Sequence, residues 1–219
     1  SGVYTVGGAG AQYASLGAIA ADLNTYGVSG PVVINISDGT YTTNVWRASF
    51  GNISGTSATN RIVIKSASND ATKVTIDVDG TSSDNYVIHF DDANYITLAH
   101  LTLINNHSSY GTVVHFEGTA SYDTIRNCVL KGYTTTSSST DHSVLYAYGF
   151  TGQHNVIINN KIQEGGTSIY WRGSGTTTCA TATTFHGNLI TNTKGYYGIY
   201  AYYNSGLSFN NNNLQRSST

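Results

Sequence analysis

The chain has 219 residues, of which only 10% are Asp, Glu, Lys or Arg, and its formal net charge is −2. This balance argues against the basic surface that binds nucleic acid, and no apolar stretch approaches the roughly 20 residues needed to span a bilayer. The 17 Tyr, 6 Phe and 2 Trp are enough, with the aliphatic residues, to form a core. We therefore expect a folded, mostly β protein with no nucleic-acid partner and no membrane span.

The first elements expected along the chain are a short strand at residues 4–6 and one amphipathic helix at residues 13–23. Four apolar residues recur in the second segment at helical spacing: Leu16, Ile19, Ala20 and Leu23. After Gly30 and Pro31 the pattern changes to strands and turns. Residues 1–30 are thus predicted to be a cap, and residues 31–219 the body of one structural domain.

Apolar pairs recur at similar intervals along the rest of the chain. One series keeps its two members five residues apart: Leu98 with Leu103, Ile125 with Leu130, Ile157 with Ile162, Phe185 with Ile190, and Phe209 with Leu214. A second series has alternating residues: Ile88 with Phe90, Val114 with Phe116, Leu145 with Ala147, Ile169 with Trp171, and Ile199 with Ala201. Short strands repeated in this way are typical of a parallel β-helix, whose equivalent strands pair from coil to coil. A β-sandwich, the alternative, does not require the fixed spacing.

Asparagines fall at fixed positions within these repeats. They occupy two adjacent columns: Asn127, Asn159 and Asn211, and one residue later Asn160, Asn188 and Asn212. Asn tolerates the left-handed backbone of turns, and its amide can hydrogen-bond to its equivalent in the next coil. We predict that these residues form structural ladders along the solenoid.

The repeats resemble the pectin-lyase-like superfamily of right-handed parallel β-helices over most of the chain. Residues 30–34 (GPVVI) and 38–42 (DGTYT) resemble the opening coils of pectinesterase-like proteins. Residues 4–41 also look like the start of secreted β-helix surface proteins of Bacteroidetes-type bacteria. The resemblance implies an all-β, right-handed parallel β-helix (solenoid) with an N-terminal strand and an amphipathic capping helix, but it specifies activity poorly.

In each strand of the second series, the residue between the two apolar residues and the residue after them are expected to face outward. These outward residues form two predicted columns on one sheet, and enzymes of this superfamily work on the outer face of such a sheet. One column is His89, His115, Tyr146, Tyr170 and Tyr200; the other is Asp91, Glu117, Tyr148, Arg172 and Tyr202. Stacked tyrosines form a flat surface with hydroxyl groups, which suits sugar rings or a lateral protein contact. The alternative is that these side chains only shield the sheet.

Asp91 and Glu117 occupy equivalent positions on adjacent coils, so their carboxylates are expected to lie roughly 5 Å apart. Such a pair could act as acid and nucleophile of a retaining glycosidase, or hold Ca²⁺ in a lyase. Arg172 is the outward basic candidate for a lyase, although it lies two coils beyond Glu117. A solvated pair or a bound ion is the non-catalytic alternative. The histidines show no linear metal-binding motif, so no other metal site is predicted.

Sequence motifs of the superfamily's enzymes are largely missing. The chain has no row of paired Asp residues like that of polygalacturonases, no Arg-x-Pro-x-x-Arg of pectate lyases and no Gly-Arg-Pro-Trp of pectinesterases, and Asp141-His142 is only a weak match to the Asp-His of pectate lyases. Two cysteines are too few for a disulfide scaffold. Cys128 is predicted to be a buried thiol and Cys179 a loop residue, without a bridge between them.

These features favour a secreted, non-catalytic structural or adhesive protein of the cell surface. The absence of Met and the start at Ser1 fit a processed chain. The chain stops within an expected coil, which suggests end-to-end stacking of copies into an extracellular filament, with residues 3–6 as a strand available for exchange. The alternatives are a polysaccharide lyase or glycoside hydrolase acting on the outer sheet face, and a glycan-binding module of a longer secreted protein.

Overall fold

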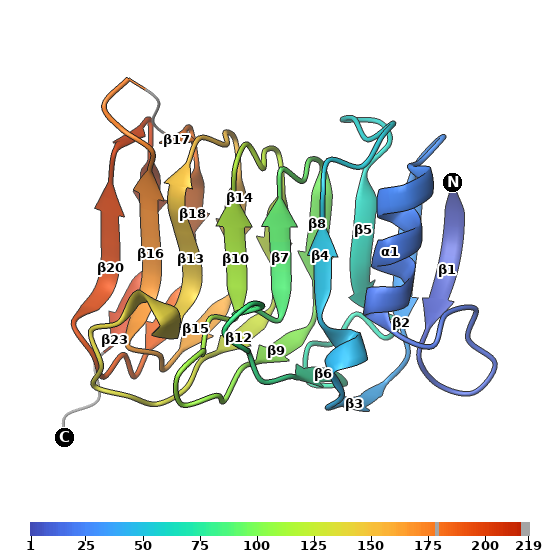
Figure 1. The fold of residues 1–219 in the computed structure, drawn as a ribbon, viewed down its shortest axis with the longest axis horizontal. Coiled ribbons are helices and arrows are strands. Elements are labelled where there is room, and N and C mark those ends of the chain that lie inside the picture. The colour runs from blue at the N-terminus through green and yellow to red at the C-terminus, as the bar shows by residue number, and fades with distance from the viewer. Residues whose placement is uncertain (178–179, 216–219) are drawn as a thin grey trace.

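The protein is a parallel β-solenoid in the computed structural model, which describes residues 1–177 and 180–215 (Figure 1). Three sheets run along its axis, and each complete coil contributes one strand to each sheet. Every strand pairing between coils is parallel, as the repeat pattern predicts.

The eight-stranded sheet, called sheet A, consists of β1 (Gly2–Val6), β2 (Val32–Ile36), β5 (Ile62–Ser66), β8 (Ile96–Ala99), β11 (Thr124–Arg126), β14 (Val156–Ile158), β18 (Thr184–His186) and β22 (Ser208–Asn210). Sheet B has seven strands: β3 (Gly39–Tyr41), β6 (Val74–Asp77), β9 (Thr102–Ile104), β12 (Val129–Lys131), β15 (Lys161–Gln163), β19 (Leu189–Thr191) and β23 (Asn213–Gln215). The apolar pairs spaced five residues apart lie one on sheet A and one on sheet B, on either side of a tight turn.

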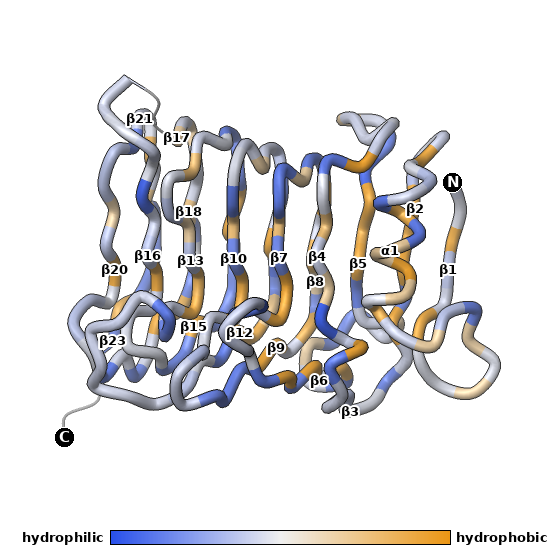
Figure 2. Tube along the Cα trace, viewed as in Figure 1, coloured by the Kyte–Doolittle hydropathy of each residue, from blue (hydrophilic) through white to orange (hydrophobic). Residues whose placement is uncertain are grey.

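Sheet C has six strands: β4 (Ala48–Phe50), β7 (Ile88–Asp91), β10 (Val114–Glu117), β13 (Ser143–Phe150), β16 (Thr167–Gly173) and β20 (Tyr197–Tyr202). The remaining short elements are β17 (Ala180–Thr181), β21 (Asn204–Ser205) and the 3-10 turns η1 (Asn44–Trp46) and η2 (Thr140–His142). Apolar stretches recur from strand to strand, among them β5, β7 and β10 (Figure 2).

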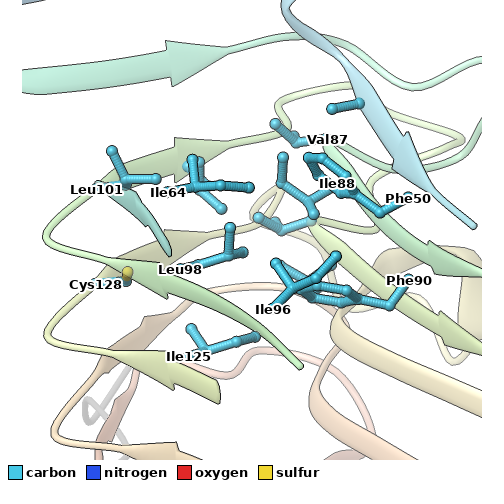
Figure 3. Packing of buried hydrophobic residues seen from close by; sticks show 14 of the residues in the cluster. Phe50, Ile64, Val87, Ile88, Phe90, Ile96, Leu98, Leu101, Ile125 and Cys128 are labelled. Carbon is cyan, nitrogen blue, oxygen red and sulfur yellow. The ribbon is translucent and has the colours of Figure 1, made fainter. Parts of the chain in front are cut away.

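The core lies between the three sheets and runs along the axis. Leu98 and Ile125 project into it from sheet A, and Phe50 and Phe90 from sheet C (Figure 3). The strand register aligns the second members of the alternating pairs, Phe90, Phe116, Ala147, Trp171 and Ala201, in one column. The first four are buried, whereas Ala201, on the last strand of the sheet, is exposed. The Trp171 ring fills the space beside Ala147 and meets Phe116 edge to face at 5.0 Å, so large and small side chains interdigitate.

The predicted helix is α1 (Leu16–Tyr26), which begins and ends three residues later than predicted. Ser15 caps its start by accepting a hydrogen bond from the Ala18 N–H, and Gly27 ends it with a φ of 67°. All four apolar residues of the predicted stripe are buried. The helix continues the layer of sheet C beyond β4 (Figure 1), so it replaces a strand instead of lying across the end of the solenoid.

The N-terminal strand predicted at residues 4–6 is β1, which is two residues longer and pairs with β2 of its own chain. It therefore extends sheet A past β2. Among the described residues, no helix is both long and apolar enough to cross a membrane.

The second asparagine column forms the predicted hydrogen-bonded ladder. Its Oδ1 atoms accept the backbone N–H of the equivalent residue one coil earlier: Asn160 from Cys128, Asn188 from Asn160, and Asn212 from Asn188, each at 2.9 Å. Each Nδ2 donates to a sheet A carbonyl of the previous coil. The residues of the first column instead adopt the left-handed backbone conformation of the turns: Asn127, Asn159 and Asn211 have φ values of 53° to 56°.

Cys128 begins this ladder column and is buried as predicted, with its thiol 3.3 Å from the Arg126 carbonyl oxygen. Burial raises the pKa of the Cys128 thiol to about 12, so it is unreactive at neutral pH. Cys179 lies outside the described residues.

Candidate functional site

The outer face of sheet C carries a continuous strip of rings, which we call the aromatic strip. It consists of His89, His115, Tyr146, Tyr170 and Tyr200, one residue per coil in exact strand register. Successive ring centroids lie 4.7, 5.0, 5.5 and 4.7 Å apart. The strip arises because period-2 alternation sends each of these residues outward while its neighbours fill the core.

The second predicted column lies beside the aromatic strip. Asp91 is paired with Glu117, and Arg172 is paired with Tyr148 on one side and Tyr202 on the other. The Arg172 guanidinium lies 4.6 Å from the centroid of the Tyr148 ring, a cation–π contact. Arg172 is therefore held among tyrosines, two strands away from the Asp91–Glu117 pair.

His89 links two side chains in a hydrogen-bonded chain across three strands. Its Nδ1 lies 3.2 Å from the Ser49 Oγ, and its Nε2 lies 3.1 Å from the Glu117 Oε2. Ser49 is on β4, His89 on β7 and Glu117 on β10, so strand pairing aligns a hydroxyl, an imidazole and a carboxylate. The His89 side chain is 11% exposed, whereas the Glu117 side chain is 54% exposed. We call these three residues the Ser49–His89–Glu117 chain.

Burial sets the charge state of the two histidines. Burial lowers the pKa of His89, and the nearby Asp91 and Glu117 carboxylates only partly oppose this. For His115, burial and the adjacent His89 lower the pKa to about 3. Both imidazoles are therefore neutral at pH 7. The His89–Glu117 contact, although close enough for an ion pair, is a hydrogen bond to a neutral ring.

One wall of the site is formed by Tyr86, whose ring lies 4.8 Å from the His89 ring. The Tyr86 hydroxyl is 3.2 Å from the Asp84 Oδ1, and Arg47 donates from Nε to the Tyr86 carbonyl oxygen at 3.1 Å. Arg47 also lies 3.9 Å from the Asp84 carboxylate. These contacts fix the Tyr86 ring against His89.

The helix positions the Ser49 end of the site. Asn24 of α1 donates to the Ser49 carbonyl oxygen at 2.9 Å and accepts from the Gly51 N–H at 2.9 Å. These two hydrogen bonds replace the backbone hydrogen bonds that a neighbouring strand would make with the edge of β4. The helix thereby holds the β4 backbone and, with it, the Ser49 hydroxyl.

Three ligand atoms of the types that bind metals come together here. His89, His115 and Glu117 each offer one, and the three atoms lie within 4.8 Å of one another. The sequence did not predict this group, because His89 lies one coil away from His115 and Glu117 and more than twenty residues before them in the sequence. A Ca²⁺ ion at Asp91 and Glu117 stays a prediction.

Sequence reasoning also missed Ser49 and Tyr86. The available signal was the alternation of Ala48, Ser49 and Phe50, which matches that of Ile88, His89 and Phe90 in the next coil. Asp141 and His142 lie in η2, which borders Tyr146 of the aromatic strip, and neither belongs to the Ser49–His89–Glu117 chain. The buried His142 is bonded through Nε2 to the Ser108 carbonyl oxygen at 2.9 Å, which is a structural role.

Comparison with solved structures shows the same architecture in known proteins. Two crystal structures of the pectin methylesterase from Aspergillus niger match all of this chain and 68% of that chain at 14% identity, with TM-scores of 0.65 for the deglycosylated form and 0.64 for the penultimately deglycosylated form. The rice weevil pectin methyl esterase matches 94% of this chain and 64% of that chain at 14% identity, with a TM-score of 0.56. No protein-family model and no curated protein sequence matches the chain. The chain therefore shares the parallel β-helix fold of these pectin methylesterases.

Proposed function

We propose that this protein is a carbohydrate esterase, which binds a polysaccharide along the aromatic strip and removes an ester substituent at the Ser49–His89–Glu117 chain. The observation that carries the proposal is the hydrogen-bonded sequence of hydroxyl, imidazole and carboxylate at one end of the strip. The fold neighbours, named as pectin methylesterases, support a carbohydrate substrate class. This favours the enzymatic alternative over the structural or adhesive function that the sequence favoured.

The aromatic strip supports the substrate side of the proposal. Tyr146, Tyr170 and Tyr200 offer ring edges and hydroxyl groups in a line beginning beside His115, because the rings are stacked on one another from coil to coil. Such surfaces suit the apolar faces and hydroxyls of sugar rings. A chain lying on the strip would extend toward His89 and reach the Ser49–His89–Glu117 chain.

The reaction follows from the protonation of His89. With its Nε2–H donated to Glu117, the ring presents its Nδ1 lone pair to the Ser49 hydroxyl. Ser49 Oγ forms a bond to the acyl carbon while its proton moves to Nδ1. The bond from the acyl carbon to the alkoxyl oxygen then breaks, and His89 returns the proton to the departing alcohol. Water repeats the two steps and releases the acid.

Glu117 has the orienting role in this scheme. Its carboxylate holds the His89 ring and stabilises the imidazolium that forms when Ser49 is deprotonated. Asp91, at the paired position on β7, adds a second negative charge near that imidazolium.

Glycoside hydrolysis is the second candidate, and a specific feature favours it. Asp91 and Glu117 are directly paired on adjacent strands, so two carboxylates lie on the same outward face. Such a pair can supply the acid and the nucleophile of a retaining glycosidase.

A secreted location, end-to-end stacking of copies and an adhesive function stay predictions.

The test is a panel of acetylated, methyl-esterified and unsubstituted polysaccharides. We expect release of acid or alcohol from an esterified member without new reducing ends. Ser49→Ala and Glu117→Gln should each lower the rate by at least ~10²-fold. His186→Gln, which changes an outward imidazole on sheet A, is the matched control and should leave the rate unchanged.

Two outcomes would contradict the esterase proposal. One is ester release that Ser49→Ala does not slow. The other is the production of reducing ends that requires both Asp91 and Glu117, which would assign the site to glycoside hydrolysis. Absence of turnover on the whole panel, with polysaccharide binding retained, would favour the non-catalytic glycan-binding function.

A further inference from the structure

We infer that His89, His115 and Glu117 form a binding site for Zn²⁺ or a similar divalent transition-metal ion on the outer face of sheet C. The three candidate ligand atoms lie within 4.8 Å of one another. The inference goes beyond the proposed function and does not rest on it, because it concerns the binding of the ion alone.

The donor set determines the class of ion. Imidazole nitrogens suit Zn²⁺, Cu²⁺, Ni²⁺ and Fe²⁺, whereas Ca²⁺ takes oxygen ligands almost entirely. Two imidazoles and one carboxylate are a familiar set for zinc sites with an open coordination position. The site therefore differs from a Ca²⁺ site at Asp91 and Glu117, with which it shares only Glu117.

The separation of the ligand atoms fits a small ion. Metal–ligand bonds of about 2.0–2.1 Å in a tetrahedral arrangement place two ligand atoms about 3.3 Å apart. The His89 Nε2 and Glu117 Oε2 are already 3.1 Å apart. The His115 ring is stacked on the His89 ring at 4.7 Å, and its ligand atom lies within 4.8 Å of the other two. A movement of at most about 1.5 Å would bring that atom to the separation that a tetrahedral site requires.

The surroundings prepare His89 as a ligand. Ser49 contacts the Nδ1 atom, and Tyr86 packs against the ring, so the imidazole has a fixed orientation with Nε2 directed at Glu117. A hydrogen bond from the second ring nitrogen to a neighbouring group is the usual support for a metal-binding histidine. The half-exposed Glu117 leaves the remaining coordination positions open to solvent.

The ion would take the place of the proton between His89 and Glu117. A protein loaded with the ion cannot use that proton in the esterase scheme, so ion binding and the proton relay exclude each other. The two proposals consequently have separate readouts: calorimetry with the metal alone for this site, and turnover of polysaccharide esters in metal-free buffer for the other.

The experiment is isothermal titration of the chelator-treated full chain with ZnCl₂, followed by Co²⁺ with its visible absorption as a second probe. We expect one saturable site per chain. His115→Gln and Glu117→Gln should each weaken Zn²⁺ binding by at least tenfold. His186→Gln is the control and should change the dissociation constant by less than about threefold, and Asp91→Asn should weaken binding less than Glu117→Gln does.

The choice of variants distinguishes a loss of Zn²⁺ binding from a loss of folding. Glu117 is half exposed and Gln keeps its shape, so loss of binding in Glu117→Gln cannot be attributed to an unfolded chain when the circular dichroism spectrum is unchanged. The inference is overturned if the wild type shows no saturable Zn²⁺ or Co²⁺ binding, if His115→Gln binds as tightly as the wild type, or if Asp91→Asn is the variant that loses the ion.

Discussion

At the scale of single residues, Asp123 has the most unfavourable surroundings for a charge in the described part of the chain. Its Oδ1 accepts the Ile96 N–H at 2.7 Å, but the buried Oδ2 has no hydrogen-bond partner. Complete burial raises the pKa of Asp123 well above its usual range, opposed by the Ile96 bond and by Arg61. One coil later the equivalent residue is Asn155, whose Nδ2 donates to the Ala120 carbonyl oxygen at 2.9 Å.

Replacing Asp123 with Asn is predicted to stabilise the protein by about 1–3 kcal/mol at pH 7, because the buried carboxylate is removed and the acceptor for Ile96 is kept. Since the folded-state pKa is raised, the wild type is most stable below the unfolded value of about 3.9 and loses stability as the pH rises through the folded-state pKa. Urea unfolding at several pH values checks this. A variant less stable than the wild type at pH 7, or with the same pH dependence, would contradict it.

The residues of the site were predictable to different degrees. The aromatic strip and the paired Asp91 and Glu117 followed from period-2 alternation, since strand register alone decides which side chains become neighbours. Ser49 and Tyr86 were missed because their functional context depends on contacts with His89 across coils. A linear sequence contains no sign of those distances. Likewise, the metal-ligand group at His89, His115 and Glu117 is visible only once the coils are stacked.

At the scale of elements, the asparagine ladder joins consecutive coils through buried side chains. Asn188 accepts from the backbone N–H and the Nδ2 of Asn160, at 2.9 and 3.1 Å, and donates to the Ile157 carbonyl oxygen at 2.8 Å. It is 1% exposed, so water cannot replace these partners. One side chain thus satisfies three buried groups of the preceding coil.

Substitution of Asn188 by Ala is predicted to destabilise the protein by about 3 kcal/mol, because it removes the side-chain partner of the Asn160 N–H and of the Ile157 carbonyl oxygen and one of the two acceptors of the Asn160 Nδ2. The matched control is Asn210→Ala in the following sheet A strand, an exposed residue whose Nδ2 donates to the Ser208 hydroxyl. Chemical denaturation of both variants measures the difference. Equal stability of Asn188→Ala and Asn210→Ala would show that the ladder contributes little to stability.

The succession of strands in the coils was largely predictable from the sequence, while the position of the helix α1 was not. Fixed spacing of apolar residues predicted the coils, because each coil must bury the same positions against its neighbours. The ends of α1 depend on the capping residues Ser15 and Gly27. Its location beside β4 depends on Asn24, whose amide satisfies the free strand edge, and this contact joins residues far apart in the chain.

At the scale of the whole molecule, the solenoid turns a one-dimensional repeat into an extended surface. Six strands of sheet C align the reactive side chains at β4, β7 and β10 with tyrosines on β13, β16 and β20. A polysaccharide is a repeating chain, so a linear face with one ring per coil is complementary to it. The central claim is therefore that the outer face of sheet C binds a polysaccharide.

Affinity electrophoresis through gels containing individual polysaccharides tests this claim most directly. Migration of the wild type is predicted to slow in at least one gel, and Tyr170→Ala and Tyr200→Ala to weaken that binding about tenfold each. Tyr26→Ala, which removes an 80% exposed ring from α1, should migrate as the wild type does. Unretarded migration of the wild type in every gel, or retardation that the two strip variants leave unchanged, would contradict the account.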